Sequence, residues 1–116
     1  MKQNVMVVDD QTDVVETVSH ILEREGYHVK KAYDGRACLE KAKTDDVKLV
    51  FLDIMMPGID GYAVAKELRK TYHEKIKIVY ISIKPKAEVN LQDVDGFIQK
   101  PFDIQRIIME ARKAVG

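Results

Sequence analysis

Residues 47–61 of this 116-residue chain read Val-Lys-Leu-Val-Phe-Leu-Asp-Ile-Met-Met-Pro-Gly-Ile-Asp-Gly. The stretch opens with a short apolar run, which is typical of a strand buried on both faces of a parallel sheet. The run ends in a carboxylate, Asp53, and a Pro57-Gly58 turn follows it. Asp60 is then a good N-cap for a helix. The stretch therefore predicts a strand, a turn and a helix, with an acid at the strand's carboxyl end.

The same alternation of apolar runs and helical stretches extends along the chain. Apolar runs occur at residues 5–8, 47–52, 76–83 and 97–98, with a weaker one around Val29. Helical periodicity follows at residues 12–25, after Asp34, from about Asp60 and after Asp103. We expect the last helix to bury its apolar residues, starting with Ile104. This order predicts an α/β domain with a parallel sheet and helices on both faces.

The bulk composition limits the classes of function. The chain is 46% hydrophobic and 33% charged, as in ordinary globular domains, and its length predicts one domain over residues 1–116. Its 19 basic and 19 acidic residues balance, which indicates no direct nucleic-acid partner and no membrane surface. Cys38 is the single cysteine, so no internal disulfide can form. No signal peptide or membrane span is indicated, so we expect a cytoplasmic location.

Polar residues follow four of the predicted strands. They are Asp9 with Asp10, then Asp53, Ser82 and Lys100. Right-handed crossovers bring the carboxyl ends of parallel strands to one edge of the sheet, where ligands bind in such folds. We therefore expect these side chains to share one pocket.

The chemistry of this set favours phosphoryl transfer. Three clustered carboxylates repel one another, and a divalent cation relieves that repulsion. Oxygen ligands without histidine or thiolate favour Mg²⁺ or Mn²⁺. Lys100 adds a positive charge and Ser82 a hydroxyl, while one carboxylate could attack phosphorus. Each residue alone has an ordinary explanation as a cap, a turn or a solvated loop, so the coincidence at successive strand ends carries the prediction.

These motifs resemble those of the receiver domains of two-component response regulators, from Val5 to the chain's end. The matching motifs are Val-Val-Asp9-Asp10, Leu-Asp53-Ile-Met-Met-Pro-Gly with Asp60-Gly61, Ser82, and Lys100-Pro101-Phe102. The resemblance implies a doubly wound, flavodoxin-like sheet of five parallel strands in the order 2-1-3-4-5.

The resemblance also implies a phosphorylation-activated signalling switch with Mg²⁺ as its cofactor. Asp53 would accept the phosphoryl group from a phosphohistidine of a sensor histidine kinase or phosphotransfer protein. Asp10, Asp53 and the backbone carbonyl of Met55 would bind Mg²⁺ directly, and Asp9 would act mainly through metal-bound water. Such a domain is not an enzyme on other substrates, because it catalyses only its own phosphorylation and dephosphorylation.

Three further positions match residues that carry the signal in the family. Lys100 would hold a phosphoryl oxygen, and the Lys100-Pro101 peptide is expected to be cis. Ser82 would move towards the phosphoryl group. Phe97 stands at the position of the aromatic switch residue and, lacking a hydroxyl, could switch only by packing.

Two features depart from the family pattern. Ile83 follows Ser82 where a small residue is usual, and a bulky side chain there could narrow access to the phosphoryl group. Only seventeen residues separate Ser82 from Lys100, which is shorter than usual by roughly one helical turn. Residues 86–94 contain few apolar positions. We therefore expect the fourth helix to be short or irregular.

Three other functions compete with this prediction. A dehalogenase-like phosphatase needs a second acid two residues after its nucleophile, where this chain has Met55. A flavin-binding carrier of the same fold needs a phosphate loop after the first strand, but residues 9–13 are acidic there. A receiver-like interaction module that is not phosphorylated stays open, because the fourth helix is altered. The downstream target is not indicated.

Overall fold

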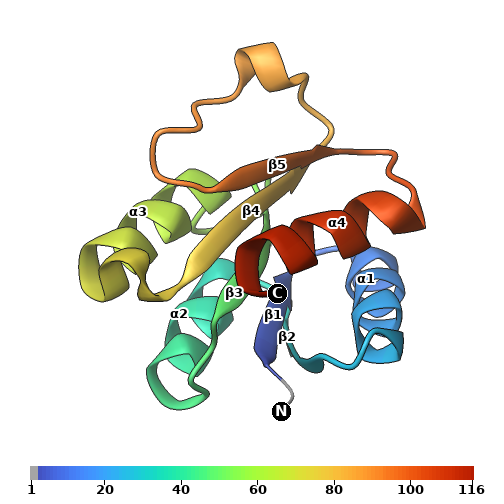
Figure 1. The fold of residues 1–116 in the computed structure, drawn as a ribbon. Coiled ribbons are helices and arrows are strands. Elements are labelled where there is room, and N and C mark those ends of the chain that lie inside the picture. The colour runs from blue at the N-terminus through green and yellow to red at the C-terminus, as the bar shows by residue number, and fades with distance from the viewer. Residues whose placement is uncertain (1–2) are drawn as a thin grey trace.

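The computed structural model describes residues 3–116 and contains one five-stranded sheet (Figure 1). The strand order is β2-β1-β3-β4-β5, and every neighbouring pair is parallel. The predicted fold class and strand order are thus confirmed. The strands are β1 (Asn4–Val8), β2 (His28–Ala32), β3 (Leu49–Asp53), β4 (Lys77–Ser82) and β5 (Gly96–Gln99).

Four α-helices cover the two faces of the sheet. Helices α1 and α4 pack together on one face, and α2 and α3 pack together on the other (Figure 1). The helices are α1 (Thr12–Arg24), α2 (Gly35–Thr44), α3 (Gly61–Tyr72) and α4 (Ile104–Val115), with 3-10 turns η1 (His73–Lys75) and η2 (Lys86–Glu88). Asp34, Asp60 and Asp103 cap α2, α3 and α4 through their side chains.

The central strands are buried on both faces, as their continuous apolar runs predict. In β1, Val5 and Val7 pack towards α1 and α4, whereas Met6 and Val8 pack towards α2 and α3. The same alternation continues through β3 and β4. This two-sided burial fixes the register, because a slip of one residue would exchange every side chain between the two faces. The fixed register in turn places the strand ends beside one another.

One expectation about burial was wrong. Ile104, which was expected to be buried, is 58% exposed, whereas Ile107, Ile108 and Ala111 of the same helix are buried. Ile104 is the first residue of α4, and periodicity does not tell at which turn a helix comes to lie over the sheet. Strand β4 ends at Ser82, where the polar residue predicts its end, and Ile83, the last residue of that apolar run, is 65% exposed.

Residues 83–95, here called the β4–β5 segment, replace the usual fourth helix. Their regular structure is limited to η2, so the expected short or irregular helix is confirmed. The segment stands out beyond β5 in Figure 1. Its far end is tied to α3, because Arg69 donates from Nε to the Asp93 carbonyl (3.1 Å) and from Nη2 to Asp95 Oδ2 (2.8 Å). Asp95 Oδ2 also accepts a bond from the Ile78 amide (2.9 Å). Within residues 3–116, no helix is long and apolar enough to cross a membrane.

Candidate functional site

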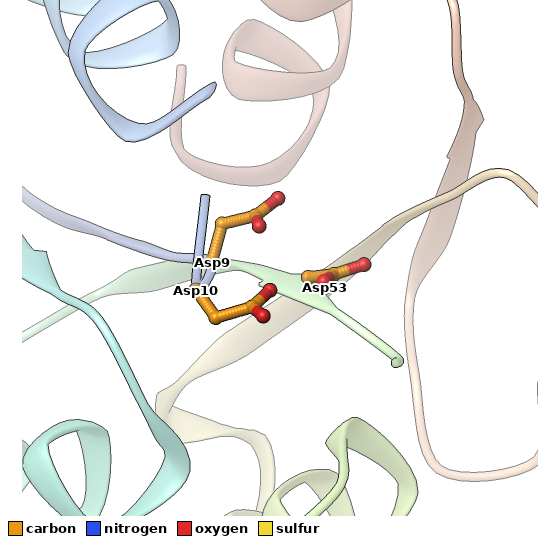
Figure 2. A group of neighbouring side chains, drawn as sticks. All are labelled: Asp9, Asp10 and Asp53. Atoms are coloured by element: carbon orange, nitrogen blue, oxygen red, sulfur yellow. The ribbon is translucent and has the colours of Figure 1, made fainter. Parts of the chain in front are cut away.

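Three carboxylates meet at the carboxyl edge of the sheet (Figure 2). Asp9 and Asp10 directly follow β1, and Asp53 is the last residue of β3. These strands are neighbours, with Val8 paired to Leu52, so their ends lie side by side. One oxygen from each carboxylate lies within 4.8 Å of the others. The predicted acidic cluster is therefore present in the structure.

Lys100 is the positive charge that touches this cluster. Its Nζ lies 2.9 Å from Asp9 Oδ2 and 3.7 Å from Asp53 Oδ1. The Lys100 amide donates to the Ser82 carbonyl (2.8 Å), which holds the residue beside the end of β4. Asp9 is 1% and Asp53 6% exposed, so these ion pairs are shielded from solvent. Charges buried in this way interact more strongly than surface charges.

The electrostatics of the cluster are visible in the pKa of Asp53. Burial, together with the charge of Asp9, raises this pKa from 3.8 to about 6, although Lys100 acts in the opposite direction. One lysine therefore does not neutralise the three carboxylates. A hard divalent cation that prefers carboxylate oxygens, such as Mg²⁺, fits this donor set.

The simpler explanation for Asp9 and Asp10, a pair that caps the next helix, does not match the geometry. The N-cap residue of α1 is Gln11, and its side chain makes no capping bond. Asp9 Oδ1 instead accepts the Gln11 amide (2.9 Å), which holds the turn after β1. Its other oxygen pairs with Lys100. The second acid, Asp10, is exposed and belongs to the cluster rather than to the helix end.

Gly61 is a residue of this site whose role was not predicted. A Cβ at this position would lie 2.3 Å from the Asp53 carbonyl oxygen and 2.6 Å from the Ile54 Cα. The Gly61 amide donates to the Ile54 carbonyl (2.7 Å), so the first turn of α3 rests directly on the backbone of the acid. The Asp60-Gly61 motif was visible in the sequence, but the close approach depends on tertiary structure. Gly58, in the turn between them, has a φ of 77°.

The family model described as the response regulator receiver domain matches residues 5–112. The chain belongs to this family. Receiver domains are the signal-accepting domains of response regulators, and the chain accordingly has a signalling role.

Curated relatives place this receiver domain among response regulators. The response regulator GtcR of Aneurinibacillus migulanus is 31% identical over 98% of this chain and 50% of its own length. The alkaline phosphatase synthesis transcriptional regulatory protein PhoP of Bacillus subtilis is 34% identical over 92% of this chain and 46% of its own length. The chain therefore spans about half the length of these relatives.

Solved structures agree with the architecture. The response regulator TrrA of Thermotoga maritima, solved in complex with Mg²⁺ and BeF, has a TM-score of 0.89 and 30% identity, covering 97% of this chain and 99% of its own. The receiver domain of NtrX from Brucella abortus has a TM-score of 0.88 and 33% identity, covering 96% and 97%. A receiver fold is thus shared along nearly the whole chain.

The remaining predicted residues of this receiver domain surround the acidic cluster or lie on the adjacent strands. Ser82, at the end of β4, is fully buried, and its Oγ accepts the Lys84 amide (3.1 Å). Phe97 of β5 is buried and paired in the sheet with Tyr80. The Lys100-Pro101 peptide is cis, as expected. The Met55 side chain is exposed, and the role of its carbonyl stays a prediction.

Proposed function

We propose that Asp53 accepts a phosphoryl group from a phosphohistidine on a sensor histidine kinase or phosphotransfer protein. The observation that supports this best is the buried Asp53 carboxylate, which lies beside two further acids and 3.7 Å from Lys100 Nζ. A carboxylate in that position can act as a nucleophile, and the Lys100 ammonium group already lies near the place that the phosphoryl oxygens would occupy.

The transfer would run in line. A carboxylate oxygen of Asp53 forms a bond to phosphorus while the phosphorus–nitrogen bond of phosphohistidine breaks, and its electron pair returns to the imidazole. Asp10, Asp53 and the Met55 carbonyl would hold Mg²⁺, with Asp9 acting through metal-bound water. When bound, Mg²⁺ neutralises the carboxylates and the phosphoryl oxygens. Later attack of water on phosphorus would break the bond between the Asp53 oxygen and phosphorus, release inorganic phosphate and restore the carboxylate. The domain would thus catalyse only its own phosphorylation and dephosphorylation.

Lys100 and Ser82 would convert this chemistry into a change of shape. Lys100 Nζ bonds Asp9 in the unphosphorylated structure (2.9 Å), and a phosphoryl oxygen on Asp53 would compete for it. The Ser82 hydroxyl, whose oxygen now accepts the Lys84 amide, would move and donate its hydrogen to a phosphoryl oxygen. The β4–β5 segment begins at the next residue and would follow. Phe97, which is buried and lacks a hydroxyl, would respond by packing alone.

The proposed setting follows from the family and the composition. We take residues 1–116 as one receiver domain that meets its kinase in the cytoplasm. The balance of 19 basic and 19 acidic residues supports no direct nucleic-acid or membrane partner for this domain. If these residues belong to a longer protein, the region that acts on its downstream target would lie outside them.

Incubation with acetyl phosphate and Mg²⁺, read by intact mass, tests the proposal. We expect the wild type to gain one phosphoryl group and Asp53→Asn to gain none. Asp34→Asn is the matched control, because Asp34 caps α2 away from the cluster and asparagine caps equally well. A wild type without any gain would favour the unphosphorylated interaction module. A gain retained in Asp53→Asn would place the acceptor elsewhere.

A further inference from the structure

An open cavity lies between the first turn of α3 and the β4–β5 segment, outside the phosphoryl site. Its volume is about 550 Å³. Tyr62 and Tyr80 supply its aromatic lining. The polar lining comes from Asp60 of the α3 cap and from Glu88, Asn90 and Asp93 of the segment.

The two tyrosines form a fixed aromatic wall. Their ring centroids are 5.6 Å apart and their planes are 86° apart, an edge-to-face arrangement. Tyr80 is only 1% exposed. Its hydroxyl takes part in none of the hydrogen bonds formed within residues 3–116. It is also not sealed from solvent as the Ser19 hydroxyl is, so it opens into the cavity.

The charges around this wall are mainly negative. Burial raises the pKa of Tyr80, and the charges of Asp93 and Asp60, which line the same cavity, add to the effect. No ion pair within residues 3–116 involves Glu88 or the Asp93 side chain. Lys66 is the one basic residue of the lining, against three acids.

The arrangement of these acids differs from that of a metal site. Within residues 3–116, only Asp9, Asp10 and Asp53 converge closely enough to share an ion. The cavity acids are instead distributed around an aromatic wall. Such a lining suits a planar, extended cation that can stack on a ring and donate several hydrogen bonds at its edge.

We propose that this cavity binds an arginine side chain of a partner protein. The guanidinium group would lie against Tyr62 and donate to Glu88, Asp93 and the free Tyr80 hydroxyl, since it carries five N–H donors in one plane. The chain already places a cation on this wall, because Lys84 Nζ lies 5.8 Å from the centre of the Tyr62 ring. The inference does not depend on phosphorylation of Asp53, although both sites touch the first turn of α3.

An NMR titration of the ¹⁵N-labelled domain with short peptides tests this directly. The probes are acetyl-Gly-Arg-Gly-amide and the same peptide with glutamine or lysine in place of arginine. We expect saturable shifts of the Tyr62, Ala63, Asn90 and Asp93 amides with the arginine peptide and none with glutamine. Lysine should bind more weakly, because it cannot stack or donate in a plane.

The double variant Glu88→Gln/Asp93→Asn removes two charges without removing a hydrogen bond made by either side chain. We expect it to weaken binding of the arginine peptide about tenfold while the rest of the spectrum stays unchanged. Glu40→Gln, in the separate groove between α2 and α3, is the control and should bind as the wild type does. The proposal would be overturned if the arginine peptide caused no shifts, or if the glutamine or lysine peptide caused equal shifts. Full binding of the arginine peptide by the double variant would also overturn it.

Discussion

The acidic site and the β4–β5 segment both begin at carboxyl ends of strands, yet they are held in different ways. Asp53 belongs to β3, is paired in the sheet with Ile81, and has the first turn of α3 packed on its backbone. The segment has one three-residue turn, and Val89 is its only buried residue. Its clearest connection to the rest of the domain is the set of hydrogen bonds that Arg69 donates to Asp93 and Asp95, at its far end.

This difference shows that the connection after β4 can change while the phosphoryl site is kept. The phosphoryl site requires only the ends of β1, β3, β4 and β5, and the sheet positions these ends whatever connects them. Shortening the connection after β4 therefore leaves Asp53 and Lys100 together. The surface that would report phosphorylation is reshaped instead, and the cavity beside Tyr62 lies on that surface.

Adding one methyl group at Gly61, beside the acidic site, and one at Gly96, which directly follows the β4–β5 segment, should give the largest difference in unfolding free energy. Gly61→Ala would place a Cβ 2.3 Å from the backbone oxygen of Asp53, so we expect a loss of about 3 kcal/mol in unfolding free energy. At Gly96, where the segment enters β5, the nearest atom is the Glu110 Oε1 at 2.6 Å, the end of a side chain. Gly96→Ala should therefore cost about 1 kcal/mol. Urea unfolding of both variants measures this, and equal losses would contradict the comparison.

The pH dependence of stability without Mg²⁺ isolates the charge of the acidic site. The pKa of Asp53 is raised from 3.8 to about 6 in the folded protein, so the folded state binds more protons than the unfolded state between those values. Stability should fall by at most about 3 kcal/mol as pH rises from about 4 to about 6. Asp53→Asn should lack this decline in urea unfolding with a chelator present. A wild-type curve that rises over this window would show that Lys100 outweighs burial and repulsion.

Removing the charge of Lys100 tests whether the lysine belongs to the site. Lys100→Met keeps most of the stem and leaves Asp9 and Asp53 without their cation, so we expect a loss of about 2 kcal/mol without Mg²⁺. Mg²⁺ should still bind and should restore much of that loss. Thermal unfolding with and without Mg²⁺ measures both effects. An unchanged melting temperature without Mg²⁺ would identify Lys100 as an ordinary loop residue. Lys86→Met, in the exposed η2 turn, is the control.

Asp10→Asn should have the smallest effect on the metal-free protein. Asp10 is exposed and its removal relieves repulsion in the cluster, so stability without Mg²⁺ should change by less than about 0.5 kcal/mol. The rise in melting temperature caused by Mg²⁺ should nevertheless be much smaller than in the wild type. Retention of the full Mg²⁺ response would remove Asp10 from the metal site. Asp13→Asn, in the first turn of α1, is the matched control.

The sequence was sufficient to predict features that depend on local pattern and strand order. Continuous apolar runs identified the buried strands, and the acids that end them identified the cluster around Asp53. The exposure of Ile104 could not be predicted, because helical periodicity shows which face of a helix is apolar but not which of its turns lie over the sheet. The contact of Gly61 with Asp53 and the meeting of Tyr62 with Tyr80 depend on how α3 packs on β3 and β4. A single sequence can show the residues involved, as in the Asp60-Gly61 motif, but not the contacts that they make.

The central claim is that an intact acidic site acts on a weakly held segment. Amide hydrogen exchange of residues 83–96, with Mg²⁺ and with or without beryllofluoride as a phosphoryl mimic, tests it most directly. We expect residues 86–94 to exchange quickly in the free domain, because Val89 alone is buried there, and to change protection when the mimic binds. Asp53→Asn treated in the same way should show no change. Strong protection of residues 86–94 that is the same with and without the mimic would contradict the account.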